Sequence, residues 1–398
     1  MVEGWKKDKL TNLISQITTG KLDANAMIPN GKYRFYTCAK DYYYIDNYAF
    51  DDEALLISGN GEYVGYIHYY KGKFNAYQRV YVLTGFKIDV RYLENFLNRY
   101  LPSRINKEVS QNNIPYIRLS TLSKMEINYP ESPTEQASIA NILSSVDEAI
   151  ESVKKSIDAA ERLKKSLMQN LLTGKMKADG TFRTEEEFYE DPKFGKVPIG
   201  WEVKKVKELS DSVQYGLNQA SSENGEIPML RMNNILKGKM TDFPLVYVDL
   251  NDTLLNQYKL AKGDILFNRT NSMDLVGKVG IFELEGDFVF ASYLIRVKVS
   301  PVNNSSYVNY ALNSYPIQCS LRSKATPAVS QANINSNSLR NTSILIPINK
   351  DEQDMIVSII SKIEEQINNK QNQIITLERL KKSLMQNLLT GKVRVGEE

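Results

Sequence analysis

The chain has 398 residues, of which 42% are hydrophobic and 24% are charged, and its formal net charge is +3. This length allows two to four domains, and the composition is that of an ordinary globular protein. No apolar run reaches membrane-spanning length and the first residues lack the apolar core of a signal peptide, so we expect a cytoplasmic protein. Two cysteines, Cys38 and Cys319, and one histidine, His68, are too few for a Cys/His zinc site, so we expect no metal.

The first globular part, residues 1–131, is predicted to be rich in β-structure. Alternating and aromatic residues between glycine breaks predict strands over Glu53–Ser58, Tyr63–Tyr69 and Gln78–Leu83, and a short helix is expected over Tyr92–Tyr100. His68 lies in the second of these strands. We therefore interpret it as structural rather than as the histidine of a Ser-His-Asp arrangement.

A long helix is predicted over residues 132–174. Its end, ERLKKSLMQNLLTGK at 161–175, returns unchanged at 378–392, which is 217 residues further along the chain. A chance match of this length is negligible, so the chain contains a duplication. Apolar residues in both copies recur at steps of three, four and seven, which predicts two amphipathic helices, each about 60 Å long. The matched apolar positions are Ile139, Leu143, Val146, Ile150, Ile157, Leu163, Leu167 and Leu171, and Ile356, Ile360, Ile363, Ile367, Ile374, Leu380, Leu384 and Leu388.

Both helices carry signals for their ends. Each start combines a favourable N-cap residue with a glutamate three positions later, which is a capping-box pattern. Each end is followed by a glycine, the residue that most readily adopts the left-handed conformation closing a helix. These residues are Ser132, Pro133 and Glu135 with Gly174 in the first copy, and Asn349 and Glu352 with Gly391 in the second.

The second half repeats this order. A connector over residues 175–195, rich in glycine, proline and charge, is predicted to be a linker or an ordered extended segment. The second globular part, residues 196–348, is predicted to be β-rich, and the second helix covers 349–392. At a shift near 196, Gly200-Trp201 repeats Gly4-Trp5, and further along, with small gaps between, Tyr293 resembles Tyr77. The elements expected in the second globular part are strands over Asp264–Asn268, Gly277–Phe282 and Leu294–Val299 and a helix over Tyr307–Ser314.

An apolar stripe on a helix of this length must be buried against a partner, and the nearest equivalent surface is the other copy. We therefore expect the two helices to pair as an antiparallel coiled coil with one globular domain at each end. The fold class is α+β, with two pseudo-repeated β-rich domains separated by the two helices. A simpler interpretation is that the helices only dimerise the protein or space its domains.

Packing requires only the apolar residues of the repeated segment, yet its polar residues are also unchanged. This identity suggests an outer surface bound by two identical partners, and recent duplication is the alternative explanation. The residues predicted to form this surface are Lys164, Lys165, Gln169 and Asn170, and Lys381, Lys382, Gln386 and Asn387.

The whole arrangement resembles the specificity subunit of type I DNA restriction-modification systems. The resemblance depends on the order of the segments from the Gly-Trp start to the second helix, and on GDILFNRTNSMDLVGKVG at 263–280, a stretch typical of target-recognition domains. The matching stretch of the first domain, DDEALLISGNGEYVGY, lacks the Arg-Thr-Asn-Ser letters. The resemblance implies that each domain recognises one half of a split, asymmetric DNA target. It also implies that the helices dock two methyltransferase subunits, which restriction-translocase subunits join.

Candidate DNA contacts are polar and basic residues in turns, because lysine and arginine bind phosphates and bidentate side chains recognise base edges. The main candidate is the turn after the strand ending at Asn268, for which a plain polar hairpin turn is the alternative. Candidates in the second domain are Asn268, Arg269, Asn271, Ser272, Lys278, Arg231, Asn233, Lys324, Ser330 and Gln331, and those in the first are Lys40, Ser58, Asn60 and Gln111.

Signals for catalysis are weak. Gly59 and Gly61 lack a following helix pattern, so they do not indicate a nucleotide-binding loop, and we expect no cofactor. The acidic run Asp51–Glu53 is interpreted as a solvated loop rather than as a nuclease site. Together with the resemblance, this places the chemistry on partner subunits. A DNA-binding scaffold without dedicated enzymatic partners and a self-contained enzyme are the alternatives.

Overall fold

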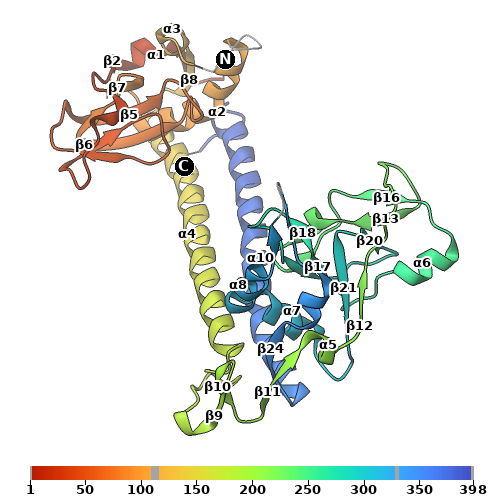
Figure 1. Ribbon diagram of the computed structural model, residues 1–398. Helices are drawn as coiled ribbons and strands as arrows, with labels where there is room; N and C mark the ends of the chain where they lie inside the picture. Colours follow the sequence, from red (N-terminus) through yellow and green to blue (C-terminus); the bar gives the residue numbers. More distant parts are fainter. Residues whose placement is uncertain (1, 109–115, 328–330, 396–398) are drawn as a thin grey trace. The chain divides into compact units, whose positions relative to one another are not determined.

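The computed structural model describes residues 2–108, 116–327 and 331–395. It divides into two units, Met1–Ser156 with Lys370–Glu398 and Ile157–Asn369, called unit 1 and unit 2 here. The two longest helices, α4 (Pro133–Leu171) and α10 (Lys350–Leu388), each contribute residues to both units (Figure 1). We call the globular residues 2–131 the first head and 196–348 the second head. Within the described ranges, no helix has the length and apolarity needed to cross a membrane.

The first head is built on a six-stranded sheet in the order β2-β7-β5-β6-β3-β4. All neighbours are antiparallel except β3 and β6. A separate pair joins the first strand to the last. The elements are β1 (Trp5–Lys9), α1 (Leu10–Leu13), β2 (Ile14–Thr19), η1 (Ala24–Ala26), β3 (Tyr33–Tyr36), β4 (Tyr43–Ile45), β5 (Phe50–Ser58), β6 (Ile67–Ala76), β7 (Val80–Phe86), α2 (Val90–Glu108), α3 (Leu119–Ser123) and β8 (Glu126–Pro130).

The second half of β5, residues 54–58, is buried on both faces of this sheet. Leu55 and Ile57 belong to a core cluster that also contains α2 and the start of α4, whereas the alternating residues Ala54 and Leu56 belong to a second cluster with Phe74. This alternation follows from the two-residue period of a strand. The α2 face of the sheet therefore attaches the first head to its long helix.

The second head contains a six-stranded sheet in the order β12-β21-β17-β19-β15-β14 and two three-stranded sheets, β16-β13-β20 and β18-β23-β22. The connector contributes η2 and β9, and β9 pairs with β10, which runs from the last connector residue into the second head. The elements are η2 (Glu185–Glu187), β9 (Phe188–Asp191), β10 (Gly195–Pro198), β11 (Trp201–Lys205), α5 (Val206–Leu209), β12 (Ser210–Tyr215), β13 (Ile227–Leu230), η3 (Met232–Asn234), β14 (Ile235–Leu236), β15 (Lys239–Met240), β16 (Val246–Val248), α6 (Asp252–Tyr258), β17 (Ile265–Asn268), β18 (Thr270–Asn271), β19 (Val279–Ile281), β20 (Val289–Phe290), β21 (Leu294–Val299), α7 (Ser305–Asn313), α8 (Tyr315–Ser323), β22 (Thr326–Pro327), β23 (Ala332–Asn333), α9 (Ser336–Arg340) and β24 (Ser343–Pro347).

Each predicted helix or strand is present as a helix or strand. The predicted and observed ends differ most where an element continues into residues that were expected to form a loop. The strand predicted over Leu294–Val299 is β21 with the same ends. The strand predicted over Tyr63–Tyr69 instead begins at Ile67 and continues to Ala76. The preceding Gly61 and Gly65 have positive φ and lie in a turn, which the aromatic residues between them concealed.

The two long helices pair antiparallel in each unit, as predicted. In unit 1, Ile139 and Leu143 near the start of α4 share a core cluster with Leu388 near the end of α10. In unit 2, Leu171 at the end of α4 shares a cluster with Ile356 near the start of α10. The start of one helix therefore contacts the end of the other in both units.

Two reciprocal ion pairs accompany this pairing. Lys164 Nζ lies 2.9 Å from a Glu364 carboxylate oxygen in unit 2, and Lys381 Nζ lies 2.7 Å from an Asp147 oxygen in unit 1. Lys164 and Lys381 are the same position of the repeat, and so are Asp147 and Glu364. Each lysine therefore binds an acid that belongs to the other copy, which supports an antiparallel register.

Burial of the apolar stripe is uneven. Its first positions in each copy, from Ile139 to Ile150 and from Ile356 to Ile367, are buried. The expectation of a continuous buried stripe is wrong at Leu163 and Leu380, which occupy the same position of the repeat and are 52% and 47% exposed. A helix in a two-helix pair covers only a narrow seam, and complete burial occurs where a head adds further side chains.

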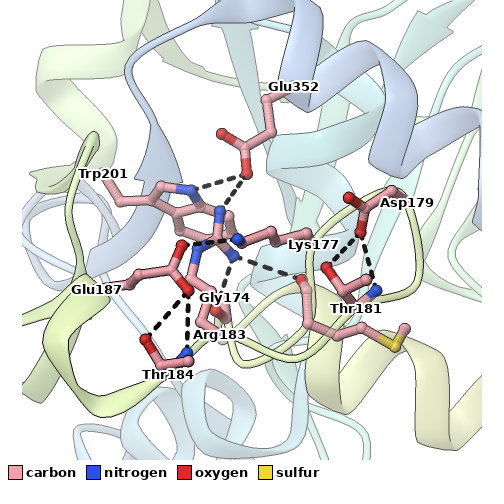
Figure 2. A network of polar contacts seen from close by, with 10 residues as sticks. Gly174, Lys177, Asp179, Thr181, Arg183, Thr184, Glu187, Trp201 and Glu352 are labelled. Atoms are coloured by element: carbon pink, nitrogen blue, oxygen red, sulfur yellow. Dashed lines mark hydrogen bonds and ion pairs between the residues drawn. The ribbon is translucent and has the colours of Figure 1, made fainter.

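The starts of the two helices do not use their glutamates as capping boxes. Ser132 caps α4 through a 3.4 Å bond from the Glu135 amide, but both carboxylate oxygens of Glu135 accept hydrogen bonds from Arg394 in unit 1. In unit 2, Glu352 accepts bonds from Arg183 and from the Trp201 indole (Figure 2). An arginine that follows one helix therefore binds the first turn of the other.

A buried glutamine next to each of these glutamates joins helix and head. Gln353 donates to the Pro347 carbonyl at 2.8 Å and accepts from the Asn304 amide at 2.8 Å. Gln136 makes the equivalent bonds to Pro130 and from Asp89. A strand end and the segment before a helix of the head are thereby attached to one side chain.

We predict that Gln353→Ala destabilises the second head, because it leaves the Pro347 carbonyl and the Asn304 amide without this partner. Loss of such a buried bond costs about 1–3 kcal/mol. Urea denaturation measures the change, and Gln366→Ala, at an exposed position of the same helix, is the matched control. Equal midpoints for the two variants would contradict the assigned role of Gln353.

Candidate nucleic-acid interface

The turn that follows β17 is held by its first residue. Asn268 is 0% exposed, and its side-chain amide donates to the Leu275 carbonyl at 3.2 Å. Its backbone is bonded to Lys278 and Gly277. The Asn268 side chain therefore lies in the interior and stabilises the turn, and its burial argues against the predicted direct contact with DNA.

Hydrogen bonds between short strands bring the candidate segments of the second head together. The Ile334 amide donates to the Arg269 carbonyl, and β18 pairs with β23, which also pairs with β22. Asn271 contacts the Met232 sulfur at 3.3 Å in η3. The segments that carry Arg269 and Asn271, Arg231 and Asn233, and Lys324 and Gln331 therefore meet on one part of the second head. The side chains of Asn233, Ser272, Lys324 and Gln331 are exposed.

Arg269 is stacked on an aromatic ring that the sequence did not indicate. Its guanidinium carbon lies 4.9 Å from the centroid of Tyr215, at the end of β12. Burial acts to raise the pKa of Tyr215, but bonds from Ser336 and the positive charges of Arg269 and Arg340 outweigh it, so this pKa is lowered. The hydrogen bonds from Ser336 are the largest cause of this lowering, and the two arginines add to it, so Arg269 and Arg340 place positive charge beside the Tyr215 ring.

Buried polar atoms without partners occur in the same place. The Nε atoms of Arg231 and Arg269 and the Oδ1 atoms of Asn268 and Asn333 are buried and have no hydrogen-bond partner in the described parts of the chain. Such groups are costly unless a ligand or water satisfies them. Asn333 was missed from the sequence, because nothing in its neighbourhood distinguishes it from an ordinary loop asparagine.

Three candidates, two in the second head and one in the first, differ from the rest of the set. Lys278 lines a hollow with Glu161, Lys164 and Glu364, so it lies near the long helices in unit 2. Ser330 lies outside the described residues. Gln111, in the first head, also lies outside them.

The two heads share one pattern of backbone hydrogen bonds, although their sequences differ. The Gly59 amide donates to the Arg79 carbonyl, as the Arg269 amide donates to the Tyr293 carbonyl. Three further amide-to-carbonyl bonds of the first head have counterparts in the second. The bond from Ile117 to Gly59 corresponds to that from Ile334 to Arg269, and the bond from Gly65 to Ser58 to that from Gly277 to Asn268. The bond from Tyr77 to Tyr36 corresponds to that from Ala291 to Leu230. Tyr293 therefore corresponds to Arg79, and its expected match with Tyr77 is wrong by two positions, which undetected length differences explain.

The candidates of the first head lie in the segments that this pattern makes equivalent. The Lys40 ammonium is exposed and lies 5.2 Å from the centroid of the Tyr63 ring. Asn60 is half-buried and forms a bridge with Tyr116. Ser58 corresponds to Asn268 and is 1% exposed, so its burial also argues against the predicted direct contact with DNA.

Groups suited to catalysis have structural partners in the first head. His68 lies 2.9 Å from the Ala39 carbonyl, and burial lowers its pKa. Asp51 and Glu53 belong to β5 rather than to a loop, and they lie near Lys73 and Lys71 at 3.9 Å. Within the described ranges, no group of three or more His, Cys, Asp or Glu residues is arranged to hold a metal ion.

The polar residues of the repeated helix segment fall into two groups. Lys164 and Lys381 form the ion pairs between the copies, and the carbonyls of Asn170 and Asn387 accept bonds from the backbone that follows the helix. The ion pairs explain the identity of the two lysines. The bonds to Asn170 and Asn387 are accepted by backbone carbonyls, which every residue has, so they do not explain why both positions are asparagine. The exposed positions are Lys165 and Gln169 in one copy and Lys382 and Gln386 in the other, beside the exposed Leu163 and Leu380.

Comparison with known proteins agrees with this arrangement. The family model described as type I restriction modification DNA specificity domain matches residues 2–162 and 198–379. A similar curated protein is the type I restriction enzyme EcoDI specificity subunit of Escherichia coli, 37% identical over 177 residues, or 44% of this chain and 39% of that protein. The MjaIX specificity subunit of Methanocaldococcus jannaschii is 29% identical over 296 residues, or 71% of this chain and 64% of that protein.

Two solved structures share the fold along the length of the chain. The S subunit of a type I restriction-modification system from M. genitalium has a TM-score of 0.62 at 16% identity and covers 96% of both chains. A chain from a study of complex assembly and conformational transition of the type I R-M system has a TM-score of 0.54 at 13% identity, covering 97% of this chain and 98% of that one.

The family-model match covers more than half of the chain, so this protein belongs to the family of type I restriction-modification DNA specificity proteins. The aligned region spans less than two thirds of the first two curated relatives, at 39% and 64% of their lengths.

The assignment of Asn268 as a structural residue gives a prediction. Asn268→Ala removes the bond to the Leu275 carbonyl and leaves a small cavity, so we expect a loss of about 1–2 kcal/mol in the free energy of unfolding. Ser272→Ala, at an exposed position of the same turn, is expected to leave it unchanged. Thermal unfolding of the two variants tests this, and a reversed order would show that the turn is not held by Asn268.

Proposed function

We propose that this chain is the DNA specificity subunit of a type I restriction-modification complex. Each head recognises one half of a bipartite target, and the target is asymmetric because the heads differ in sequence. The observation that carries this proposal is the set of equivalent segments in both heads, which gather basic and amide side chains on the same backbone framework. One framework that carries two different sets of side chains suits the recognition of two different half-sites.

The chemistry of these segments suits duplex DNA. Arg269 is stacked on Tyr215, and this contact orients its guanidinium, the group that recognises guanine edges by two hydrogen bonds. Asn271 offers an amide of the kind that recognises adenine. The exposed Lys324 and Lys40 supply charges for phosphates.

The exposed parts of the repeated segment are the proposed docking surface for two methyltransferase subunits. Leu163, Lys165 and Gln169 are exposed in one copy, and Leu380, Lys382 and Gln386 are their counterparts in the other. Two equivalent surfaces on one chain favour two identical partners. Restriction-translocase subunits join through that complex, and the methylation and cleavage sites belong to these partners rather than to this non-catalytic chain. A DNA-binding scaffold without enzymatic partners is the alternative proposal.

We predict that Arg269→Ala changes the recognition of one half-site only. Loss of a bidentate contact lowers discrimination at one base pair by about 1–3 kcal/mol, whereas loss of a phosphate contact weakens binding to all sequences alike. The measurement is a map of methylated adenines in cells that express the chain with the methyltransferase subunits of its system. A continuous rather than bipartite wild-type motif would contradict recognition by two heads.

We also predict that Leu163→Asp and Leu380→Asp each remove one methyltransferase subunit from the complex, and that the double variant removes both. A charge in the centre of a protein interface weakens binding by about 2 kcal/mol or more. Native mass spectrometry gives the stoichiometry, with Lys155→Asp, exposed on α4 outside the repeated segment, as control. Retention of both subunits by the double variant would support the scaffold alternative.

A further inference from the structure

The most informative difference between the heads lies at one backbone position. Gly59 and Arg269 make equivalent backbone bonds, yet one has no side chain and the other has a stacked guanidinium. A Cβ atom added at Gly59 would lie 2.3 Å from the Arg79 carbonyl oxygen. Real Cβ atoms do not approach a backbone oxygen this closely, so the first head cannot place a side chain where the second head has Arg269.

The first head places an arginine on the neighbouring strand instead. Arg79 precedes β7 and corresponds to Tyr293 of the second head, because their carbonyls accept the equivalent bonds from Gly59 and Arg269. The Arg79 side chain is exposed. The positions of an arginine and an uncharged residue are thus exchanged between two adjacent strands of the two heads.

A hollow with Gly59 in its wall surrounds Arg79. It is lined by Thr19, Gly59, Asn60, Gln78, Arg79, Tyr81, Tyr116 and Ile117. Thr19 of this set ends β2, as Tyr215 ends β12 in the second head. Thr19 has a small side chain and Gly59 has none. The space that the Arg269–Tyr215 stack fills in the second head is therefore open in the first head.

The acidic residues near this hollow do not neutralise Arg79, so its guanidinium can bind a ligand. The Gln78 side chain donates to Asp23 at 2.7 Å, so this acid already has a partner. Other basic residues of the first head, such as Lys6, Lys7 and Arg91, form ion pairs with nearby carboxylates. Among the residues described, no carboxylate forms an ion pair with Arg79.

We infer that Arg79 is the specificity-determining arginine of the first head and the counterpart of Arg269, and that it recognises a guanine edge in the first half-site. The inference rests on the proposed function. Its ligand is a G·C pair presented in the major groove, where guanine offers two acceptors that match an arginine. Asn60 and Tyr116 lie on the wall of the same hollow and limit the directions that the guanidinium can take.

The test uses the chain in complex with its methyltransferase subunits. Methylated sites are mapped in cells, and competition binding in vitro uses duplexes that differ at one base pair of either half-site. Arg79→Ala is expected to lower discrimination at one G·C position of the first half-site by about 5- to 150-fold and to leave the second unchanged. Arg269→Ala is expected to do the reverse.

Lys87→Ala is the matched control, because it removes one cation at the opposite end of the same strand β7, about 25 Å away. Thermal unfolding of Arg79→Ala shows whether the first head stays folded, and Arg79→Lys, which keeps the charge but loses the bidentate geometry, separates recognition from attraction. An unchanged half-site preference of Arg79→Ala would overturn the inference. Equally weakened binding of this variant to all duplexes, with a smaller salt dependence of its affinity, would also overturn it, because that result indicates a phosphate contact. A wild-type complex without a bipartite motif would overturn the proposed function instead.

Discussion

An arginine that follows each long helix binds a glutamate in the first turn of the other, and the arrangement of both units depends on this contact. Arg183 and Arg394 lie 2.6 Å from Glu352 and Glu135. The Glu135 side chain is almost fully buried, and a buried carboxylate without its arginine would be costly. The adjoining buried glutamine in turn holds the head. Helix pairing and attachment of the heads are therefore coupled through two neighbouring side chains.

This coupling changes how the repeated segment is interpreted. Identity over fifteen residues first suggested an external binding surface. Part of that identity has a role within the chain, since Lys164 and Lys381 form ion pairs with acids of the opposite copy. Contacts within the chain do not explain a smaller set of exposed residues around Leu163 and Leu380. The proposed docking surface is therefore smaller than the surface that the sequence alone suggested.

The sequence predicted what is periodic or repeated, and it failed where the determinant is a contact between distant segments. The helix period predicted α4, α10 and their antiparallel pairing. A polar turn after a strand led to the prediction of Arg269, Asn271 and Asn268 as DNA contacts. The sequence did not show that the Asn268 side chain is buried, because polarity does not tell which side chain points inward. Tyr215 and Arg79 were missed because their roles depend on contacts with other strands. Tyr215 contacts Arg269, which is more than 40 residues away, and Arg79 is bonded through its backbone to Gly59 on a neighbouring segment. Only the backbone bonding pattern aligns the two heads correctly.

Gly59 also limits how the two heads can evolve. In the second head, the side chain at position 269 extends from the end of β17, so under the proposed function a substitution there is expected to alter base preference. In the first head that route is closed, because a side chain at position 59 would displace the backbone of the neighbouring strand. New preferences in the first half-site must therefore arise at other positions along this wall, and the two halves of the target are expected to diverge through different mutational paths.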